Sequence, residues 1–144
     1  MTTEKAKLVI TKDPSGNENG WLMELFKDGD KTLSYLTVTK PGAFKGYHLH
    51  RLRTANFICV KGKVRLITYT FNGDYEFHGE WTRDEVILEP GDRVTVPPFT
   101  PTALESISEE DSWLINYPNP AFDPTITDEQ VEYTLQELEE GVVK

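Results

Sequence analysis

Short apolar runs, separated by residues that favour turns, recur along most of the chain. Within residues 31–40 the pattern alternates, so that Leu33 and Tyr35 face one side and Leu36 faces the other, as expected of a strand. Comparable runs lie at residues 7–10, 21–26, 55–60, 64–71, 75–81, 85–98 and 111–118. Many short strands at such regular spacing indicate an all-β sandwich or barrel.

One connection between these runs has the features of a tight turn. Lys61-Gly62-Lys63 joins residues 55–60 to residues 64–71. Short connections that contain glycine are typical of β-hairpins, because glycine adopts the left-handed backbone conformations that such turns need. The sequence therefore predicts that these two strands are neighbours in one sheet.

The last twenty residues change period and predict a short helix. Thr127 and Gln130 have the spacing of a capping box. Val131, Leu135 and Leu138 would then lie on one apolar stripe. Gly141 is a natural end for this helix. We expect the helix to pack on the barrel or to cover a dimer interface.

The composition limits the kind of protein this is. A chain of 144 residues fits one domain, residues 1–144, and its 38% hydrophobic content is ordinary for a globular protein. Its net charge of −9 argues against a nucleic-acid or membrane-surface binder. A single cysteine excludes an internal disulfide. No apolar run has the length of a signal peptide or a membrane span, so we expect a cytoplasmic protein.

The segment 41–62 holds two of the three histidines, His48 and His50. Residues two apart in a strand face the same side, so these imidazoles would converge. Histidine is both the commonest metal ligand and the usual acid–base group near neutral pH. The pair could therefore bind a metal, transfer protons, or simply occupy the strand.

The glycine spacing around this pair resembles the first cupin motif, G-x5-H-x-H-x(3,4)-E-x6-G. The match runs through Gly42, His48, His50 and Gly62, with Ala55 at the glutamate position. The second motif, G-x5-P-x-G-x2-H, begins with Gly91 and Pro97 and has Thr102, or Pro101 in a shifted register, at its histidine. The resemblance implies a cupin double-stranded β-helix, a jelly-roll barrel with a short C-terminal helix.

The same comparison leaves few metal ligands. Two imidazoles alone hold a first-row metal weakly, since catalytic sites usually supply at least three protein ligands. Further ligands could come from His78, Glu76, Glu80 or Glu105, although no spacing favours any of them. We therefore expect no cofactor, with a metal at His48 and His50 as the less favoured alternative.

A narrower resemblance concerns enzymes of deoxysugar biosynthesis. "KGYHLH" (45–50) is similar to the R-G-x-H element of the dTDP-4-dehydrorhamnose 3,5-epimerase family, and closer to that of dTDP-sugar 3,4-ketoisomerases. Residues 38–50 also resemble the cupin domain of bifunctional capsule-sugar synthesis proteins. The resemblance implies that His48 is the general base and His50 a second proton carrier or orienter. It implies that Tyr35 or Tyr117 is the acid.

The chain departs from the epimerases at several positions. They have a lysine where this chain has Ala55, and their second histidine near 101–102 is missing. Their late aspartate, which orients the base, has no clear counterpart in the sequence. The paired histidines fit the ketoisomerases better.

Seven of the fifteen basic residues lie between positions 40 and 65: Lys40, Lys45, Arg51, Arg53, Lys61, Lys63 and Arg65. A local basic patch can attract an anion despite a negative net charge. By the resemblance, Lys45 stands at the phosphate-contacting position, and we expect Arg53 and Arg65 to help bind a diphosphate. Phe44, Tyr47 or Trp81 could stack on a base. The alternative is a solvated charged face.

These observations leave three hypotheses. The first is an isomerase or epimerase that acts by proton transfer on a nucleotide-diphosphate 4-keto-6-deoxy sugar, with no nucleic-acid or membrane partner. The second is a non-catalytic cupin that binds a sugar nucleotide or a partner. The third is a metal-dependent cupin enzyme with atypical ligands. In each case we expect a homodimer, because barrels of this kind can pair through edge strands.

Overall fold

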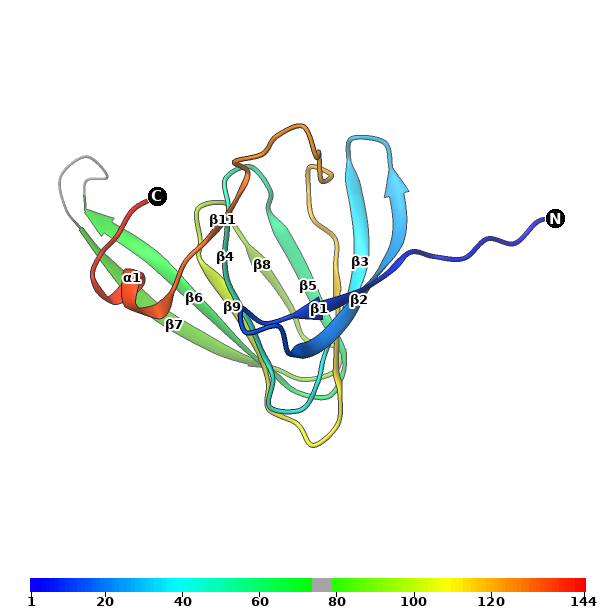
Figure 1. Cartoon of the computed structure of the whole chain (residues 1–144), viewed down its shortest axis with the longest axis horizontal. Coiled ribbons are helices and arrows are strands. Elements are labelled where there is room, and N and C mark those ends of the chain that lie inside the picture. The colour runs from blue at the N-terminus through cyan, green and yellow to red at the C-terminus, as the bar shows by residue number, and fades with distance from the viewer. Residues whose placement is uncertain (74–78) are drawn as a thin grey trace.

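The strands of the computed structural model, which describes residues 1–73 and 79–144, form two antiparallel sheets that face each other (Figure 1). The six-stranded sheet has the order β1 (Leu8–Lys12), β2 (Glu18–Asp28), β3 (Thr32–Thr39), β10 (Ser112–Asn116), β5 (Ala55–Lys61), β8 (Arg93–Val96). The five-stranded sheet has the order β11 (Gln130–Glu132), β4 (Phe44–His50), β9 (Thr102–Ser106), β6 (Val64–Gly73), β7 (Gly79–Leu88). The all-β prediction is confirmed.

Apolar side chains gather in two clusters, one on each face of the five-stranded sheet. The barrel interior joins both sheets through Ala55, Cys59, Val64, Leu66, Leu88, Val96, Leu104 and Leu114. The outer cluster contains Tyr47, Leu49, Ile67, Tyr69, Trp81, Ala103, Tyr133 and Leu138. Neighbouring residues such as Leu66 and Ile67 belong to different clusters, because successive side chains in a strand point to opposite faces.

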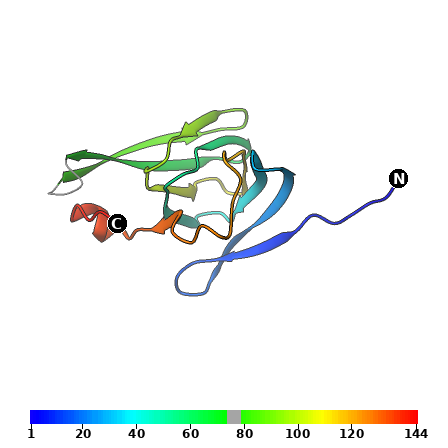
Figure 2. The ribbon, with the colours of Figure 1, turned by 90° about the horizontal axis from the view of Figure 1, so that it is seen from above.

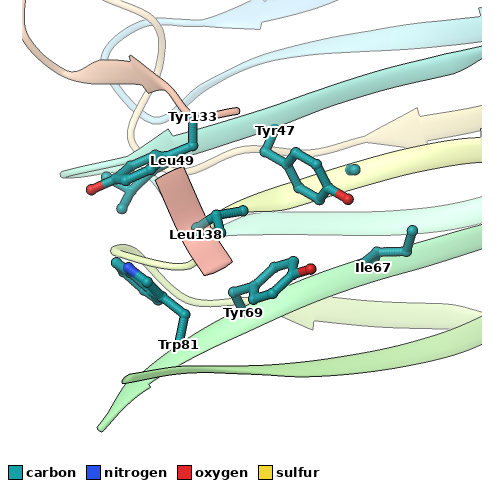
Figure 3. Packing of buried hydrophobic residues seen from close by; sticks show 8 residues of the cluster. Tyr47, Leu49, Ile67, Tyr69, Trp81, Tyr133 and Leu138 are labelled. Atoms are coloured by element: carbon teal, nitrogen blue, oxygen red, sulfur yellow. The ribbon is translucent and has the colours of Figure 1, made fainter. Parts of the chain in front are cut away.

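The outer cluster is covered by helix α1 (Leu135–Glu139) and the residues after it (Figure 3). Its aromatic rings meet edge to face, with 5.6 Å between the ring centroids of Tyr47 and Tyr69 and 5.7 Å between those of Trp81 and Tyr133. The Trp81 indole Nε1 donates a hydrogen bond of 2.7 Å to the carbonyl of Val142. This face of the barrel is therefore a second core, held by the C-terminal segment.

The hairpin predicted at Lys61-Gly62-Lys63 is wrong. Strand β5 belongs to the six-stranded sheet and β6 to the five-stranded sheet, so the turn crosses between the sheets. Strand β5 pairs with β10 and β8, which occupy both of its edges. The turn residues are the same for a hairpin and a crossover, and the long-range pairing decides between them.

The C-terminal helix exists, but it begins seven residues later than the sequence predicts. Residues Gln130–Glu132 form strand β11, and the N-cap of α1 is Thr134, which forms a capping box with Glu137. The predicted end at Gly141 agrees with the structure, since that glycine has a left-handed φ of 75° just after the C-cap. Along the described ranges, no helix combines the length and apolar character needed to cross a bilayer.

Thr127, the predicted N-cap, and Thr134, the observed N-cap, can be compared in one test. Replacing Thr134 with alanine removes the side-chain acceptor of the Glu137 N–H, and we expect it to lower the free energy of unfolding by about 1 kcal/mol. Thr127→Ala should leave stability unchanged, because Thr127 is exposed and lies outside the helix. Urea unfolding of both variants measures the difference. Equal losses would contradict this assignment of the cap.

Candidate active site

A small cavity of about 60 Å³ lies between the two sheets, at the end of the barrel where β4, β8 and β10 finish and β5 and β9 begin. We call it the inner cavity. Its polar lining is Tyr35, His48, His50, Arg53, Thr100, Thr102 and Asn116, and its apolar lining is Ala55, Phe57, Val96, Pro97 and Leu104. Ionisable and apolar side chains thus share one enclosed space, the kind of setting in which protein groups acquire chemical roles.

Both histidines that line this cavity lie on strand β4. Tyr47 and Leu49 point to the outer cluster, so His48 and His50 point to the opposite face and line the cavity. The predicted convergence of the two imidazoles on one side of a strand is therefore observed.

His50 is held by a buried ion pair. The Arg53 and Glu129 side chains are only 7% and 9% exposed, and the Arg53 Nε lies 3.0 Å from the Glu129 Oε1. The same carboxylate accepts a hydrogen bond from the Arg53 backbone N–H at 3.1 Å. Its other oxygen lies 3.0 Å from the His50 Nδ1. A residue 79 positions away in the chain thus orients the imidazole.

These contacts determine the protonation of the group. Burial raises the pKa of Glu129, but the hydrogen bonds from Arg53 and His50 outweigh it and bring the pKa to about 2. The His50 Nδ1 lies 3.0 Å from the Glu129 Oε2, which accepts, and 3.0 Å from the Arg53 Nη2, which donates. Burial lowers the pKa of His50, and the nearby Arg53 charge adds to this against the opposing hydrogen bond with Glu129. His50 therefore favours the neutral form.

His48 has a carboxylate partner of its own. In the antiparallel pairing of β11 with β4, Glu132 lies directly opposite His48, and its Oε1 is 2.8 Å from the His48 Nδ1. The hydrogen bond from His48 lowers the pKa of Glu132 despite some desolvation. The ionised Glu132 at Nδ1 makes Nε2 the atom of His48 that can accept a proton.

Tyr35 of β3 lines the cavity from the opposite sheet. Its hydroxyl oxygen accepts a hydrogen bond of 2.8 Å from the Asn116 Nδ2. The Asn116 amide is oriented by its Oδ1, which accepts the backbone N–H of Asn56 at 3.1 Å. The Tyr35 proton is therefore not needed for this contact and is available for donation. Burial raises the pKa of Tyr35, so the phenol stays protonated at neutral pH.

The comparisons with known proteins agree with this architecture. Residues 15–130 match the family model described as Polysaccharide biosynthesis C-terminal domain. The chain belongs to this family. It is also 26% identical over 123 residues to the probable low-salt glycan biosynthesis epimerase Agl13 of Haloferax volcanii, covering 81% of this chain and 79% of that protein.

Solved structures show the fold of this family member. The capsular polysaccharide assembling protein CapF of Staphylococcus aureus superimposes with a TM-score of 0.69 and 23% identity over 90% of the chain. A cupin-2 domain from Rhodospirillum rubrum superimposes with a TM-score of 0.67 and 15% identity, covering 95% of this chain and 83% of that one. The predicted cupin barrel is confirmed. The chain spans 32% of the CapF chain.

Three predicted site residues lie away from the inner cavity of this polysaccharide-biosynthesis domain. Tyr117 is 39% exposed and is not part of the lining. The Lys45 amine donates to the carbonyl of Val38 at 2.9 Å, and burial lowers its pKa to about 8. Arg65 pairs with Glu105 at 3.0 Å on the surface. Arg53 does line the cavity, but its guanidinium is engaged by Glu129.

Two imidazoles, those of His48 and His50, are the histidine donors in the described cavity lining. Ala55 and Thr102, which stand where the cupin motifs have a glutamate and a histidine, both line the cavity without supplying those ligands. Each histidine has a carboxylate within 3.0 Å of Nδ1, an arrangement that metal-binding histidines also use. Over residues 1–73 and 79–144, no group of three or more His, Cys, Asp or Glu side chains could hold an ion. His78 and Glu76 lie outside the described residues.

Glu80 and Glu105, the other two acids considered as ligands, are absent from the cavity lining. The residues that sequence reasoning missed are Glu129, Glu132 and Asn116. A signal for Glu132 was present, because polar Gln130 and Glu132 alternate with apolar Val131 and Tyr133, the period of a strand. Glu132 supplies for His48 the orienting carboxylate that had no clear counterpart in the sequence.

Proposed function

We propose that this domain is an isomerase or epimerase that acts by proton transfer on a nucleotide-diphosphate 4-keto-6-deoxy sugar. Its relatives, a probable glycan biosynthesis epimerase and a capsular polysaccharide assembling protein, support sugar chemistry of this kind. One observation carries the proposal: His48 and His50, each oriented by a carboxylate, share an enclosed cavity with a protonated tyrosine. The histidines supply a base from one sheet, and the tyrosine supplies an acid from the other sheet.

In the proposed reaction the His48 Nε2 removes a proton from the carbon next to the C4 ketone. Such a carbon acid is weak, so the base must be neutral at the working pH and the developing enolate must be stabilised. Glu132 would stabilise the imidazolium that forms, because its carboxylate already accepts the Nδ1 hydrogen. The charge on the base is therefore compensated within the site.

The return of the proton is assigned to Tyr35. The tyrosine comes from the six-stranded sheet and the histidines from the five-stranded sheet, so the two act from opposite sides of the cavity. His50, kept neutral by burial and by the nearby Arg53 charge, would relay a second proton or orient the substrate. This arrangement suits a 3,4-ketoisomerase or a 3,5-epimerase, and we propose that neither needs a cofactor.

The test is exchange with solvent. Incubation with dTDP-4-keto-6-deoxyglucose in deuterated water should yield an isomer that carries deuterium next to, or at, the original carbonyl carbon, measured by NMR and mass spectrometry. Neither deuterium incorporation nor a new product would overturn the proposal. Tight binding of the nucleotide sugar without exchange would instead favour a non-catalytic binding module.

We also propose that the protein acts as a homodimer in the cytoplasm. Strand β1 is the edge of the six-stranded sheet, in a hairpin with β2 (Figures 1 and 2). Leu8, Val9 and Ile10 of this strand are all exposed. Exposed apolar edge strands readily pair with another chain, and light scattering would give the mass in solution.

The two tyrosines named by the sequence give a paired prediction. Tyr35→Phe removes the hydroxyl from the cavity, and we expect product formation to fall about a hundredfold. Tyr117→Phe should leave the rate unchanged, because Tyr117 lies on the surface outside the cavity. Steady-state rates of the purified variants measure both. Loss of activity in the Tyr117 variant alone would reassign the acid.

A further inference from the structure

A second pocket lies on the outer face of the five-stranded sheet, beside the mouth of the inner cavity. We call it the outer pocket; its volume is about 370 Å³ and its lining includes Leu49, Arg51, Trp81, Phe99, Tyr133 and Lys144. Leu49, Trp81 and Tyr133 belong to the outer cluster and form an apolar floor (Figure 3). The volume falls in the range of small-molecule sites.

The loop around Phe99 lies between the inner cavity and the outer pocket and lines both. The Phe99 backbone N–H donates a hydrogen bond of 2.8 Å to the carbonyl of His50. Pro97 and Thr100 on either side of Phe99 line the inner cavity, while Phe99 itself lines the outer pocket. The loop between β8 and β9 therefore forms a rim that contributes residues to both spaces.

Phe99 is an unusual residue for its place. Among the described residues, Phe99 alone has a positive φ without being glycine, with a value of 61°. Its side chain is 50% exposed. The second cupin motif carries glycine at this position, which would adopt such a φ without strain. A bulky aromatic in this conformation costs about 1–3 kcal/mol, yet burial of the ring does not compensate for it. Strain of this kind tends to mark functional positions.

Arg51 supplies positive charge at the same rim. Its Nε donates to the carbonyl of Asp128 at 2.8 Å, which fixes the guanidinium. Among the residues that the structure describes, no carboxylate lies within ion-pairing distance of Arg51. Lys144 adds a second cation, although its amine lies 2.6 Å from Glu137. Arginine without a countercharge is suited to bidentate contacts with phosphate.

We propose that the outer pocket binds the nucleoside diphosphate end of the substrate, with the base on Phe99 and the diphosphate at Arg51. This inference rests on the proposed function, which needs a nucleotide sugar. The inner cavity, at about 60 Å³, is far smaller than pockets that enclose ligands of that size. The sugar would enter the inner cavity, and the remainder would cross the rim into the outer pocket.

The proposal is tested with dTDP as the probe, by calorimetry on the whole chain. Arg51→Gln should weaken dTDP binding about tenfold or more, through the lost charge. Phe99→Gly should weaken it about tenfold through lost stacking, while thermal stability stays equal or rises because glycine relieves the positive φ. A merely structural role for Phe99 would not separate affinity from stability in this way.

Two controls separate this inference from the proposed function. Arg93→Gln removes an exposed arginine at the start of β8 and should not change dTDP binding. His48→Asn should bind dTDP normally while losing deuterium exchange. Binding of dTDP that is insensitive to Arg51 and Phe99, or no binding of dTDP or UDP at millimolar concentration, would overturn the outer pocket even if exchange occurs. If dTDP binds and both Arg51→Gln and Phe99→Gly weaken it, the outer pocket is supported. If the wild type then shows no deuterium exchange into the sugar, the proposed enzymatic function is rejected while the pocket stands.

Discussion

His48→Asn is expected to abolish proton abstraction, lowering the rate of deuterium incorporation into a nucleotide 4-keto-6-deoxy sugar by about a thousandfold. Asparagine keeps a polar group beside Glu132 but has no atom that accepts a proton near neutral pH. The imidazole is 37% exposed, so its loss should not disturb the core. Mass spectrometry of the recovered sugar measures the exchange.

The partner of His48 provides the comparison. Glu132→Gln keeps the shape of the side chain and removes the charge that stabilises the imidazolium, so we expect a smaller loss, about tenfold. Urea unfolding should give similar stabilities for both variants and the wild type, because the Glu132 side chain is 65% exposed. Full activity in His48→Asn would reject His48 as the base and leave His50 as the group to test.

The histidine pair was accessible from the sequence because its geometry is local. Alternation along a strand places His48 and His50 on one face whatever the rest of the chain does. The glycine spacing from Gly42 to Gly62 added the fold, since turns at those points bound β4 and β5. Tyr35 was predicted from the resemblance to the ketoisomerases, in which a tyrosine lies at a comparable strand position. The features that sequence alone predicts are thus strand faces and turns, which are determined by residues a few positions apart in the chain.

The partners of these residues were not accessible in the same way. Glu129 lies 79 residues from His50, and Asn116 lies 81 residues from Tyr35. The pairing of β11 with β4 decides the first contact, and the pairing of β10 with β3 decides the second. The prediction of a helix from Thr127 hid strand β11. A capping-box pattern occurs twice in this segment, at 127–130 and at 134–137. The strand pairing of Gln130–Glu132 rules out the first.

The basic residues show a further limit of sequence proximity. Lys45 and Arg65 lie near the histidines in the chain or on a strand of the same sheet, yet neither reaches the cavity. The Lys45 amine donates to the carbonyl of Val38, and the Arg65 guanidinium forms ion pairs with Glu85 and Glu105. Arg53 does reach it, but as the buried partner of a carboxylate. Charge counted along a sequence does not tell which cations are already neutralised.

Glu129→Gln is expected to cost about 3–5 kcal/mol of folding stability at pH 7, the largest structural effect in the site. The substitution leaves the Arg53 guanidinium, only 7% exposed, without its countercharge. A matched control is Glu105→Gln, which breaks a pair of the same 3.0 Å length with Arg65. Those side chains are 31% and 33% exposed, so we expect a loss below about 1 kcal/mol. Urea unfolding of both variants gives the comparison.

The pH dependence of the stability difference between the wild type and Glu129→Gln identifies the cause of that difference. The pKa of Glu129 is lowered from an ordinary 4.5 to about 2 in the folded state, so the unfolded chain binds its proton first as pH falls. The stability that the carboxylate contributes is complete above about pH 4.5 and is lost as pH falls toward 2. The gap between wild type and Glu129→Gln should therefore be widest at neutral pH and close on acidification. A gap that stays constant from pH 7 to pH 3 would show that the lost stability comes from packing, because a packing contribution does not depend on the protonation of Glu129.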